Sequence, residues 1–148
     1  MQIPKDNPMK KKVLFLCTGN SCRSQMAEGL MRHFYGNRFQ AYSAGTEPTA
    51  VNPRAIQVMD EIDIDISRQH SKSVAEFENN TFDTVVTVCD RANESCPLFL
   101  GNVKRIHWSL EDPAEAKGEE KTVLAVFRKV RDQIRAHIDG EFNTNANR

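Results

Sequence analysis

Short apolar runs alternate with segments of helical periodicity along this chain. The run VLFLC at residues 13–17 is continuously apolar, which is typical of a strand buried on both faces. Segments that are less continuously apolar predict further strands at 39–45, 81–89 and 103–108. The pattern therefore predicts a sheet whose strands are separated along the chain by helical segments.

Helices are predicted between these strands and after the last of them. The first runs from Arg23 to about Tyr35, and the second follows the cap Asn52-Pro53 to about Ile62. A capping box of Ser73 with Glu76 predicts a short helix to about Phe77, and the last helix spans about 120–139. The apolar stripes of the first and last helices are Met26, Ala27, Leu30, Met31 and Phe34, and Val123, Phe127, Val130, Ile134 and Ile138.

The alternation of strand and helix predicts an α/β fold. We expect a single catalytic domain over residues 11–140, with a four-stranded parallel doubly wound sheet flanked by helices. Residues 1–10 and 141–148 are polar and are expected to be flexible termini. In such sheets ligands bind beyond the carboxyl ends of the strands. Cys17 and Cys89 end two of the predicted strands, so we expect them to face one site.

The amino-acid composition excludes some classes of binding partner for this domain. Among 148 residues, Lys and Arg total 20 and Asp and Glu total 20, so no basic field attracts nucleic acid or an anionic membrane. The apolar run at 13–17 is too short for a signal peptide or a membrane span. We therefore expect a cytoplasmic protein that contacts neither nucleic acid nor membrane.

Four cysteines, Cys17, Cys22, Cys89 and Cys96, are expected in that reducing compartment, where static disulfides are rare. Their intervals are Cys-x4-Cys and Cys-x6-Cys, with no histidine at ligand spacing, so zinc is a poor fit. Neither a metal nor another cofactor is expected. Redox or nucleophilic chemistry therefore remains as the role of the cysteines.

The octapeptide CTGNSCRS, residues 17–24, has the composition of an anion-binding loop that contains a nucleophile. A strand–loop–helix turn directs backbone N–H groups inward, and the following helix adds the positive end of its dipole. Gly19 relieves the tight backbone, Asn20 tolerates unusual dihedral angles, and Arg23 offers a planar fork of donors for two oxygens. Cys17 at the base of this cradle would be stabilised as a thiolate by the loop amides and by Ser24. The alternative, that a cysteine is a small buried hydrophobe, is our interpretation of Cys22.

At these residues the sequence resembles a known family. CTGNSCRSQMAEG is similar to the phosphate loop of the low-molecular-weight protein tyrosine phosphatase fold, and more narrowly to that of the arsenate reductases built on it. The similarity runs from about residue 11 to 138. It includes the motifs YSAG (42–45), VNPRAI (51–56), DIDIS (63–67), VVTVCDRANESCP (85–97), NVKRIHW (102–108) and EDP (111–113).

The resemblance implies a role for each residue of the loop. Cys17 is the nucleophile, Arg23 binds the oxyanion, and Asn20 and Ser24 support the loop and the thiolate. The rest of the anion-binding loop consists of Thr18, Gly19, Ser21 and Cys22. Asp112 is the general acid by resemblance. In isolation, an Asp before Pro113 is more often a turn residue, but a leaving hydroxide needs a proton near the cradle.

The same loop serves phosphatases and reductases, and the other cysteines favour the reductase. By resemblance, Cys17 attacks arsenate, Cys89 attacks Cys17 and releases arsenite, and Cys96 then forms a Cys89–Cys96 redox disulfide. Thioredoxin is the expected reductant, although glutaredoxin or a small thiol serves related cascades. If the intervening segment DRANES is helical, the two cysteines are too far apart for a disulfide, and the segment must unwind.

Two alternatives remain beside the reductase. One is a low-molecular-weight tyrosine phosphatase, but such relatives tend to carry an aromatic residue after the Asp-Pro pair, where this chain has Ala114 and Glu115. The other is a non-catalytic thiol sensor, which would not need Arg23 and Asp112 together. A monomer is expected.

Potassium is a further point of comparison with the family. Some of these reductases bind it with residues that match Asn20, Glu28, Ser43 and an acid after the DIDIS motif. Lys72 stands at the position of that acid. Its ammonium can replace the cation, so we expect no potassium dependence; the alternative interpretation is a solvated surface lysine.

Overall fold

A single parallel sheet organises the molecule. The computed structural model describes residues 10–94, 96, 99 and 101–143; the expectations for 1–9 and 144–148 lie outside these residues. In this part of the chain the sheet has four strands in the order β2-β1-β3-β4. The strands are β1 (Lys11–Cys17), β2 (Phe39–Gly45), β3 (Thr84–Thr87) and β4 (Lys104–His107). Every pairing is parallel, which confirms the predicted sheet.

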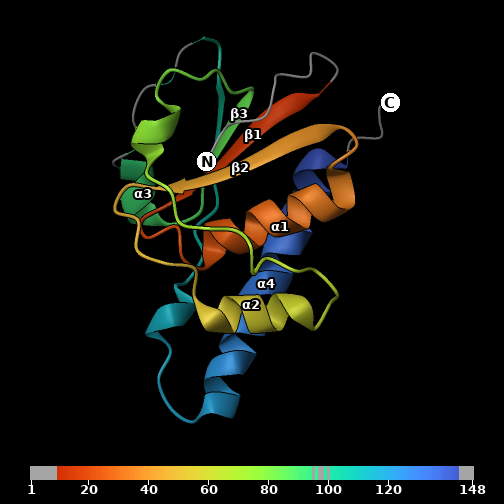
Figure 1. The fold of residues 1–148 in the computed structure, drawn as a ribbon, viewed down its shortest axis with the longest axis vertical. Coiled ribbons are helices and arrows are strands. Elements are labelled where there is room, and N and C mark those ends of the chain that lie inside the picture. The colour runs from red at the N-terminus through yellow and green to blue at the C-terminus, as the bar shows by residue number, and fades with distance from the viewer. Residues whose placement is uncertain (1–9, 95, 97–98, 100, 144–148) are drawn as a thin grey trace.

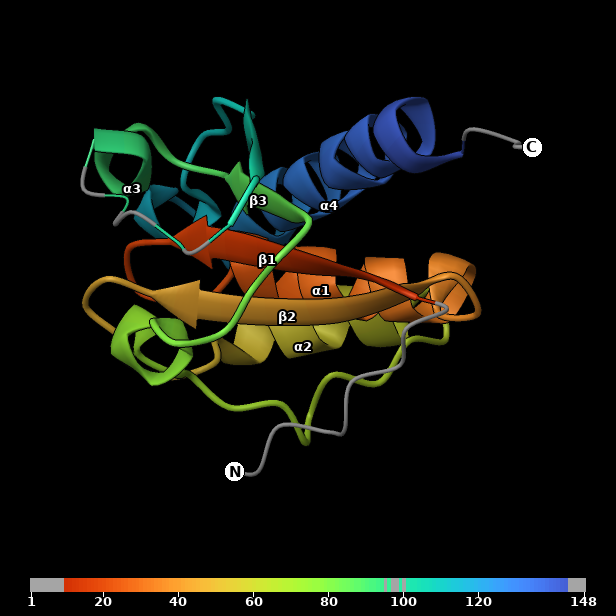
Figure 2. The same ribbon diagram turned by 90° about the horizontal axis from the view of Figure 1, so that it is seen from above.

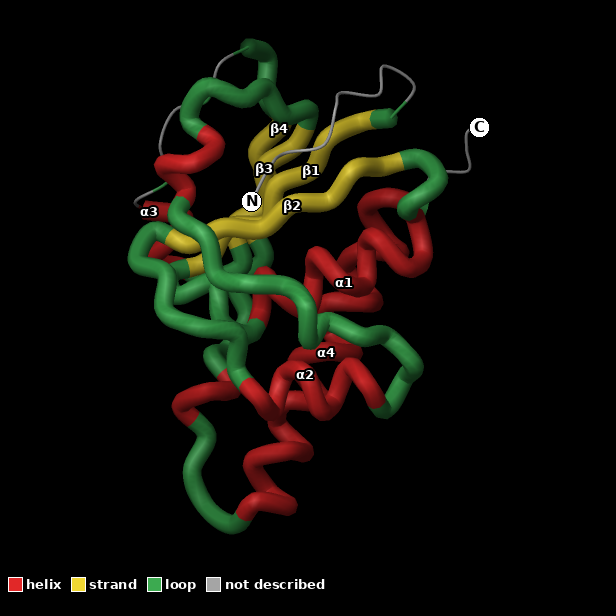
Figure 3. The backbone as a smooth tube through the Cα atoms, viewed as in Figure 1, coloured by secondary structure: helices red, strands yellow, loops and turns green. Residues whose placement is uncertain are grey.

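The helices alternate with these strands, as Figure 3 shows in red and yellow. They are α1 (Arg23–Tyr35), α2 (Pro53–Asp60), α3 (Asp90–Glu94) and α4 (Glu120–Phe142), with 3-10 turns η1 (Val74–Phe77) and η2 (Pro113–Glu115). In Figures 1 and 2, α1, α2 and α4 lie on the same side of the sheet. Over the described residues, no helix has both the length and the apolar character that a membrane crossing needs.

The strand order places a topological switch point between β1 and β3. From β1 the chain moves through α1 to β2 on one side, and from β3 it moves through α3 to β4 on the other. Because right-handed crossovers in opposite directions lie on opposite faces, the sheet is doubly wound. A crevice opens beyond the carboxyl ends of the two central strands in such sheets.

The core lies where the apolar stripes of the first and last helices meet the sheet. Residues 13–16 of β1 are fully buried, as is most of the predicted stripe of α4. One member of the predicted stripe of α1 is wrong: Phe34 is 38% exposed, and the Arg135 guanidinium lies over its ring at 3.7 Å. The next residue, Tyr35, is buried instead of Phe34 and donates a hydrogen bond to Asp139.

Several element boundaries differ from the predicted ones, including β1, which begins at Lys11 rather than at residue 13, and β4, which is one residue shorter at each end. The third strand covers Thr84–Thr87 rather than 81–89, because the chain leaves the ladder before Cys89 and turns into α3. The second helix ends at Asp60 rather than near Ile62. The last helix continues through Phe142, two residues into the expected tail, because Phe142 is buried against Phe39 with ring centroids 5.3 Å apart.

Candidate active site

The site lies at the switch point of the sheet. Cys17 is the last residue of β1, and Cys89 follows β3 by two residues. Both line one cavity of about 440 Å³. Its other predicted members are Thr18, Gly19, Ser21, Cys22, Arg23 and Asp112, and its further lining residues are Glu47, Thr49, Arg91, Ala114 and Glu115. Residues from four separate segments of the chain are therefore brought together, and among them Cys17 and Cys89 line one cavity, as expected from their positions at strand ends.

The loop after β1 turns its carbonyl groups away from this cavity. Each carbonyl oxygen from Cys17 to Cys22 accepts a hydrogen bond from outside residues 17–22. The donors are, in order, Thr46 N, Glu47 N, Thr49 N, Ser71 Oγ, Asn52 N and Met26 N, at 3.1, 2.8, 3.0, 2.7, 3.0 and 2.9 Å. In a planar trans peptide the N–H points opposite to the C=O. The N–H groups of residues 18–23 therefore converge on the inside of the loop, which is an anion-binding arrangement.

Close approach of the last residue of β2 to the loop makes this arrangement possible. A Cβ on Gly45 would lie 2.6 Å from Thr18 O and 2.9 Å from Asn20 N, so only glycine fits between them. Asn20 itself has a φ of 50°, in the left-handed region that asparagine tolerates. Its side-chain Oδ1 accepts a hydrogen bond from Lys72 N at 2.8 Å, which fixes the orientation of the amide.

Two donors face the sulfur of Cys17. Asn20 N donates to Cys17 Sγ at 3.2 Å, and Ser24 Oγ lies 2.8 Å from the same sulfur. Asn20 Nδ2 donates to Ser24 Oγ at 2.8 Å, so the serine hydroxyl proton is available to Cys17. Hydrogen bonds of this kind stabilise a thiolate. Asn20 and Ser24 thus lie where the predicted support of the loop and of the Cys17 sulfur requires them, and that role stays a prediction.

Cys22 differs from Cys17 in its surroundings, although both belong to the same loop. It is only 3% exposed, and burial raises the pKa of its thiol to about 12. Its sulfur lies 3.7 Å from Ser21 Oγ. Cys22 therefore stays a neutral thiol at physiological pH, which agrees with its interpretation as a small buried hydrophobe.

Arg23 and Asp112 meet at the side of the cavity. Arg23 Nη1 donates to Leu110 O at 2.9 Å, which anchors the guanidinium, and Nη2 lies 3.6 Å from Asp112 Oδ2. The other oxygen, Asp112 Oδ1, accepts from Ala114 N at 3.0 Å. Asp112 thus caps the turn that begins at Pro113, as the turn interpretation expects. It also lines the cavity, which a general acid needs in order to reach a bound oxyanion.

The remaining cysteines occupy different places. Cys89 is buried, its sulfur lies 3.3 Å from Thr18 Oγ1, and it accepts a hydrogen bond from Ala92 N at 3.4 Å. Cys96 is half-buried and accepts from Arg105 Nη1 at 3.0 Å. All four cysteines are free thiols, and α3 occupies the interval between these two. The helical segment considered from the sequence is therefore present, although Ser95 and Pro97 lie outside the described residues.

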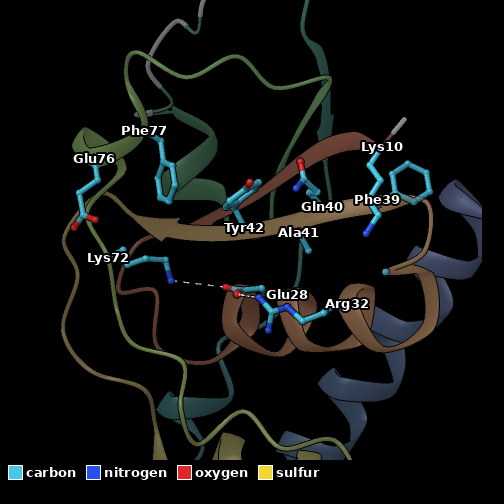
Figure 4. Close-up of a pocket in the computed structure, with 11 residues that line it drawn as sticks. Lys10, Glu28, Arg32, Phe39, Gln40, Ala41, Tyr42, Lys72, Glu76 and Phe77 are labelled. Atoms are coloured by element: carbon cyan, nitrogen blue, oxygen red, sulfur yellow. Dashed lines mark hydrogen bonds and ion pairs between the residues drawn. The ribbon is translucent and has the colours of Figure 1, made fainter. Parts of the chain in front are cut away.

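A charged cluster lies behind the loop. Lys72 is 5% exposed, donates from Nζ to His70 O at 2.9 Å and lies 3.8 Å from Glu28 Oε1. Glu28 also pairs with Arg32 and accepts from Ser43 Oγ, and Figure 4 shows Lys72 and Arg32 converging on its carboxylate. Burial lowers the pKa of Lys72 and the Glu28 charge opposes that shift. With an ammonium beside Glu28, these residues do not fit a potassium ion.

Sequence reasoning missed part of the cavity wall. Glu47, Thr49 and Arg91 line the cavity but were not predicted as site residues. Glu47 and Thr49 also donate two of the backbone hydrogen bonds that orient the loop. Their position in the sequence, just beyond the strands β2 and β3, could have indicated that they line the site, because the loops at the carboxyl edge of a parallel sheet meet around the ligand site.

Taken together, the features define a class of protein: an α/β domain with a cysteine at the base of an oxyanion-binding strand–loop–helix turn. The sequence matches the family described as low molecular weight phosphotyrosine protein phosphatase over residues 12–144, and the chain belongs to this family.

Similar proteins carry a narrower name. An arsenate reductase of Halalkalibacterium halodurans is 48% identical over 129 residues, which cover 87% of this chain and 93% of that protein. An arsenate reductase of Bacillus subtilis is 47% identical over 127 residues, 85% of this chain and 91% of its own length. The solved structure of an arsenate reductase in the oxidized state superposes with a TM-score of 0.76 at 35% identity, covering 88% of this chain and 95% of that one.

Proposed function

We propose that this protein is an arsenate reductase that uses Cys17, Cys89 and Cys96 in a thiol cascade. The observation that carries this proposal is the position of Cys89: it lines the same cavity as Cys17, and its sulfur contacts the hydroxyl of Thr18 in the anion-binding loop. A phosphatase resolves its covalent intermediate with water and needs no second cysteine. A reductase needs one within reach of the first.

In the first step the loop binds arsenate. The inward N–H groups of residues 18–23 and the Arg23 guanidinium hold its oxygens, and the Cys17 thiolate attacks arsenic. An S–As bond forms and one oxygen leaves as water after protonation. Asp112 supplies that proton, since it lines the cavity beside Arg23.

The next two steps are thiol exchanges. The Cys89 thiolate attacks Cys17 Sγ, the S–As bond breaks, its electron pair remains on arsenic, and arsenite leaves. A Cys17–Cys89 disulfide remains. The Cys96 thiolate then attacks Cys89 Sγ, and Cys17 leaves as a thiolate. Arsenic is thereby reduced by two electrons, and the pair Cys89–Cys96 is oxidised to a disulfide.

The cavity wall favours a small inorganic anion over a phosphorylated side chain. Ala114 and Glu115 follow the Asp-Pro pair and line the cavity, and its described lining includes no aromatic residue. Stacking against an aromatic ring is therefore absent from this part of the wall, where a phosphotyrosine ring would have to lie. Slow hydrolysis of activated phosphate esters remains compatible with the loop.

An external dithiol must restore Cys89 and Cys96. We assign this role to thioredoxin. We further propose that the enzyme is a cytoplasmic monomer and that it uses no metal or other cofactor. The test is arsenate-dependent NADPH oxidation with thioredoxin and thioredoxin reductase, compared with glutathione and glutaredoxin. Multiple turnovers with the first pair are expected. Failure to turn over arsenate with either system would contradict the reductase, and would favour a phosphatase or a thiol sensor.

Replacement of Arg23 by lysine is expected to lower kcat/KM for arsenate by about a hundredfold, since an ammonium keeps the charge but loses the planar pair of donors. Steady-state kinetics measure the loss. Arg54→Lys is a matched control, because Arg54 makes a two-pronged contact with Glu120 on the surface, outside the cavity. Near-normal kinetics for Arg23→Lys would mean that the anion is held in another way.

Potassium is expected to leave the enzyme unchanged. At equal ionic strength, kcat/KM and the melting temperature should agree in KCl and NaCl, because the Lys72 ammonium already lies beside Glu28. Lys72→Met should instead lower the free energy of unfolding by roughly 1–3 kcal/mol, since it removes a partner of a buried carboxylate. A specific gain of activity or stability of the wild type in KCl would show that a cation site exists after all.

A further inference from the structure

Strand β4 lies at the edge of the sheet and contacts both ends of the segment between the two redox cysteines. At one end, Arg105 Nη1 donates to Cys96 Sγ at 3.0 Å. At the other, His107 Nε2 lies 2.8 Å from Asp90 Oδ1, and Asp90 directly follows Cys89. Arg105 and His107 are two residues apart on the strand, so their side chains lie on the same face. This face of β4 therefore acts as a support for the segment.

The contact at Asp90 belongs to a small network. Ser109 Oγ donates to Asp90 Oδ1 at 3.1 Å, and Thr87 Oγ1 lies 2.7 Å from His107 Nδ1. The hydrogen bond with His107 is the main cause that lowers the pKa of Asp90. These contacts tie the N-terminus of α3 to β3 and β4. Thus the start of the segment is held independently of Cys96.

We propose that Arg105 is a positioning residue that holds Cys96 on β4 and stabilises its thiolate for the last thiol exchange. The proposal rests on the cascade proposed above. In that step Cys96 attacks Cys89, the Cys89–Cys96 bond forms, and the Cys17–Cys89 bond breaks with its electron pair on Cys17. Arg105 takes no part in these bond changes. Its contribution is the charge-assisted hydrogen bond to the attacking sulfur.

The chemistry of the contact explains why a cation belongs there. Only the thiolate attacks a disulfide, and a neighbouring guanidinium increases the fraction of thiolate at neutral pH. Arg105 is exposed, so solvent and salt screen its charge, and the effect should be modest. A modest effect suits the step, because strong stabilisation of a thiolate also lowers its nucleophilicity.

Alkylation of Cys96 tests this proposal on the full chain. In a Cys17→Ser, Cys89→Ser background, the remaining thiols are Cys96 and the buried Cys22, and mass spectrometry assigns the iodoacetamide adduct to each. At neutral pH, Arg105→Gln should slow the alkylation of Cys96 by about threefold, in line with the modest strength of exposed charge contacts. High salt should narrow the difference, and Arg105→Lys should restore most of the rate.

The matched control is Lys104→Gln. It removes the adjacent cation of β4, whose Nζ pairs with Glu141 at 2.9 Å instead of with Cys96. This variant should alkylate like the parent chain. An equal loss in both variants would mean a general electrostatic effect, and an unchanged alkylation rate in Arg105→Gln would overturn the role of Arg105.

A second measurement separates this proposal from the cascade on which it rests. In an otherwise native chain, Arg105→Gln should accumulate the Cys17–Cys89 species during turnover, seen by non-reducing peptide mapping. If Cys96→Ser turns over arsenate repeatedly, the cascade is wrong, whatever the alkylation of Cys96 shows. If Cys96→Ser stalls but Arg105→Gln accumulates no such species, the cascade stands and the positioning role of Arg105 is overturned.

Discussion

Replacing Cys17 by serine is expected to abolish arsenate reduction and the hydrolysis of p-nitrophenyl phosphate together. Loss of the nucleophile should lower both rates by a factor on the order of 10⁴ or more, because both reactions begin with attack by this sulfur. The hydroxyl of serine is only slightly ionised at neutral pH, so the donors Asn20 and Ser24 cannot compensate. Steady-state assays of both substrates measure the loss, and circular dichroism reports the fold.

Cys22 provides the control within the same loop. Its thiol stays neutral because burial raises its pKa to about 12, so Cys22→Ala removes no nucleophile. This variant should keep arsenate reduction even if its thermal stability falls. Retained turnover in Cys17→Ser would contradict the assignment of Cys17.

Replacing Cys89 by serine is expected to separate the two activities. Arsenate reduction should fall to background, because no sulfur remains to resolve the adduct on Cys17. Hydrolysis of p-nitrophenyl phosphate needs only the loop, Cys17 and Asp112, so any such activity of the wild type should persist. Both rates are measured on the same preparation. Multiple turnovers of arsenate at the wild-type rate would rule out the cascade and make the phosphatase the better interpretation.

Cys96→Ser should stop one step later. After a single round, peptide mapping under non-reducing conditions should show Cys17 joined to Cys89, whereas oxidised wild type should show Cys89 joined to Cys96. Formation of that second disulfide must disrupt α3, since the helix lies between the two cysteines. Amide exchange over Asp90–Glu94 should therefore be faster in the oxidised protein than in the reduced one.

The regular elements could be predicted because their signals are local. The fully apolar run of β1, the Asn52-Pro53 start of α2 and the long stripe of α4 each lie within a few consecutive turns or residues, and the structure confirms all three. The prediction was wrong where tertiary packing decides which of two neighbouring apolar side chains of a helix is buried. Phe34 fits the helical period of α1, yet the position of α4 leaves it under Arg135 at the surface.

The sequence by itself determined the chemistry of the anion-binding loop, because nucleophile, glycine, asparagine, arginine and serine are contiguous in residues 17–24 and bounded by a strand and a helix. Only the tertiary structure decided what surrounds that loop. Backbone N–H groups just beyond β2 orient its carbonyls, and backbone groups carry no residue-specific signal. The contacts of Lys72 with Glu28 and of Cys96 with Arg105 likewise join separate segments. Such pairs exist only once the strands have their order, because proximity across a sheet depends on topology rather than on neighbours in the chain.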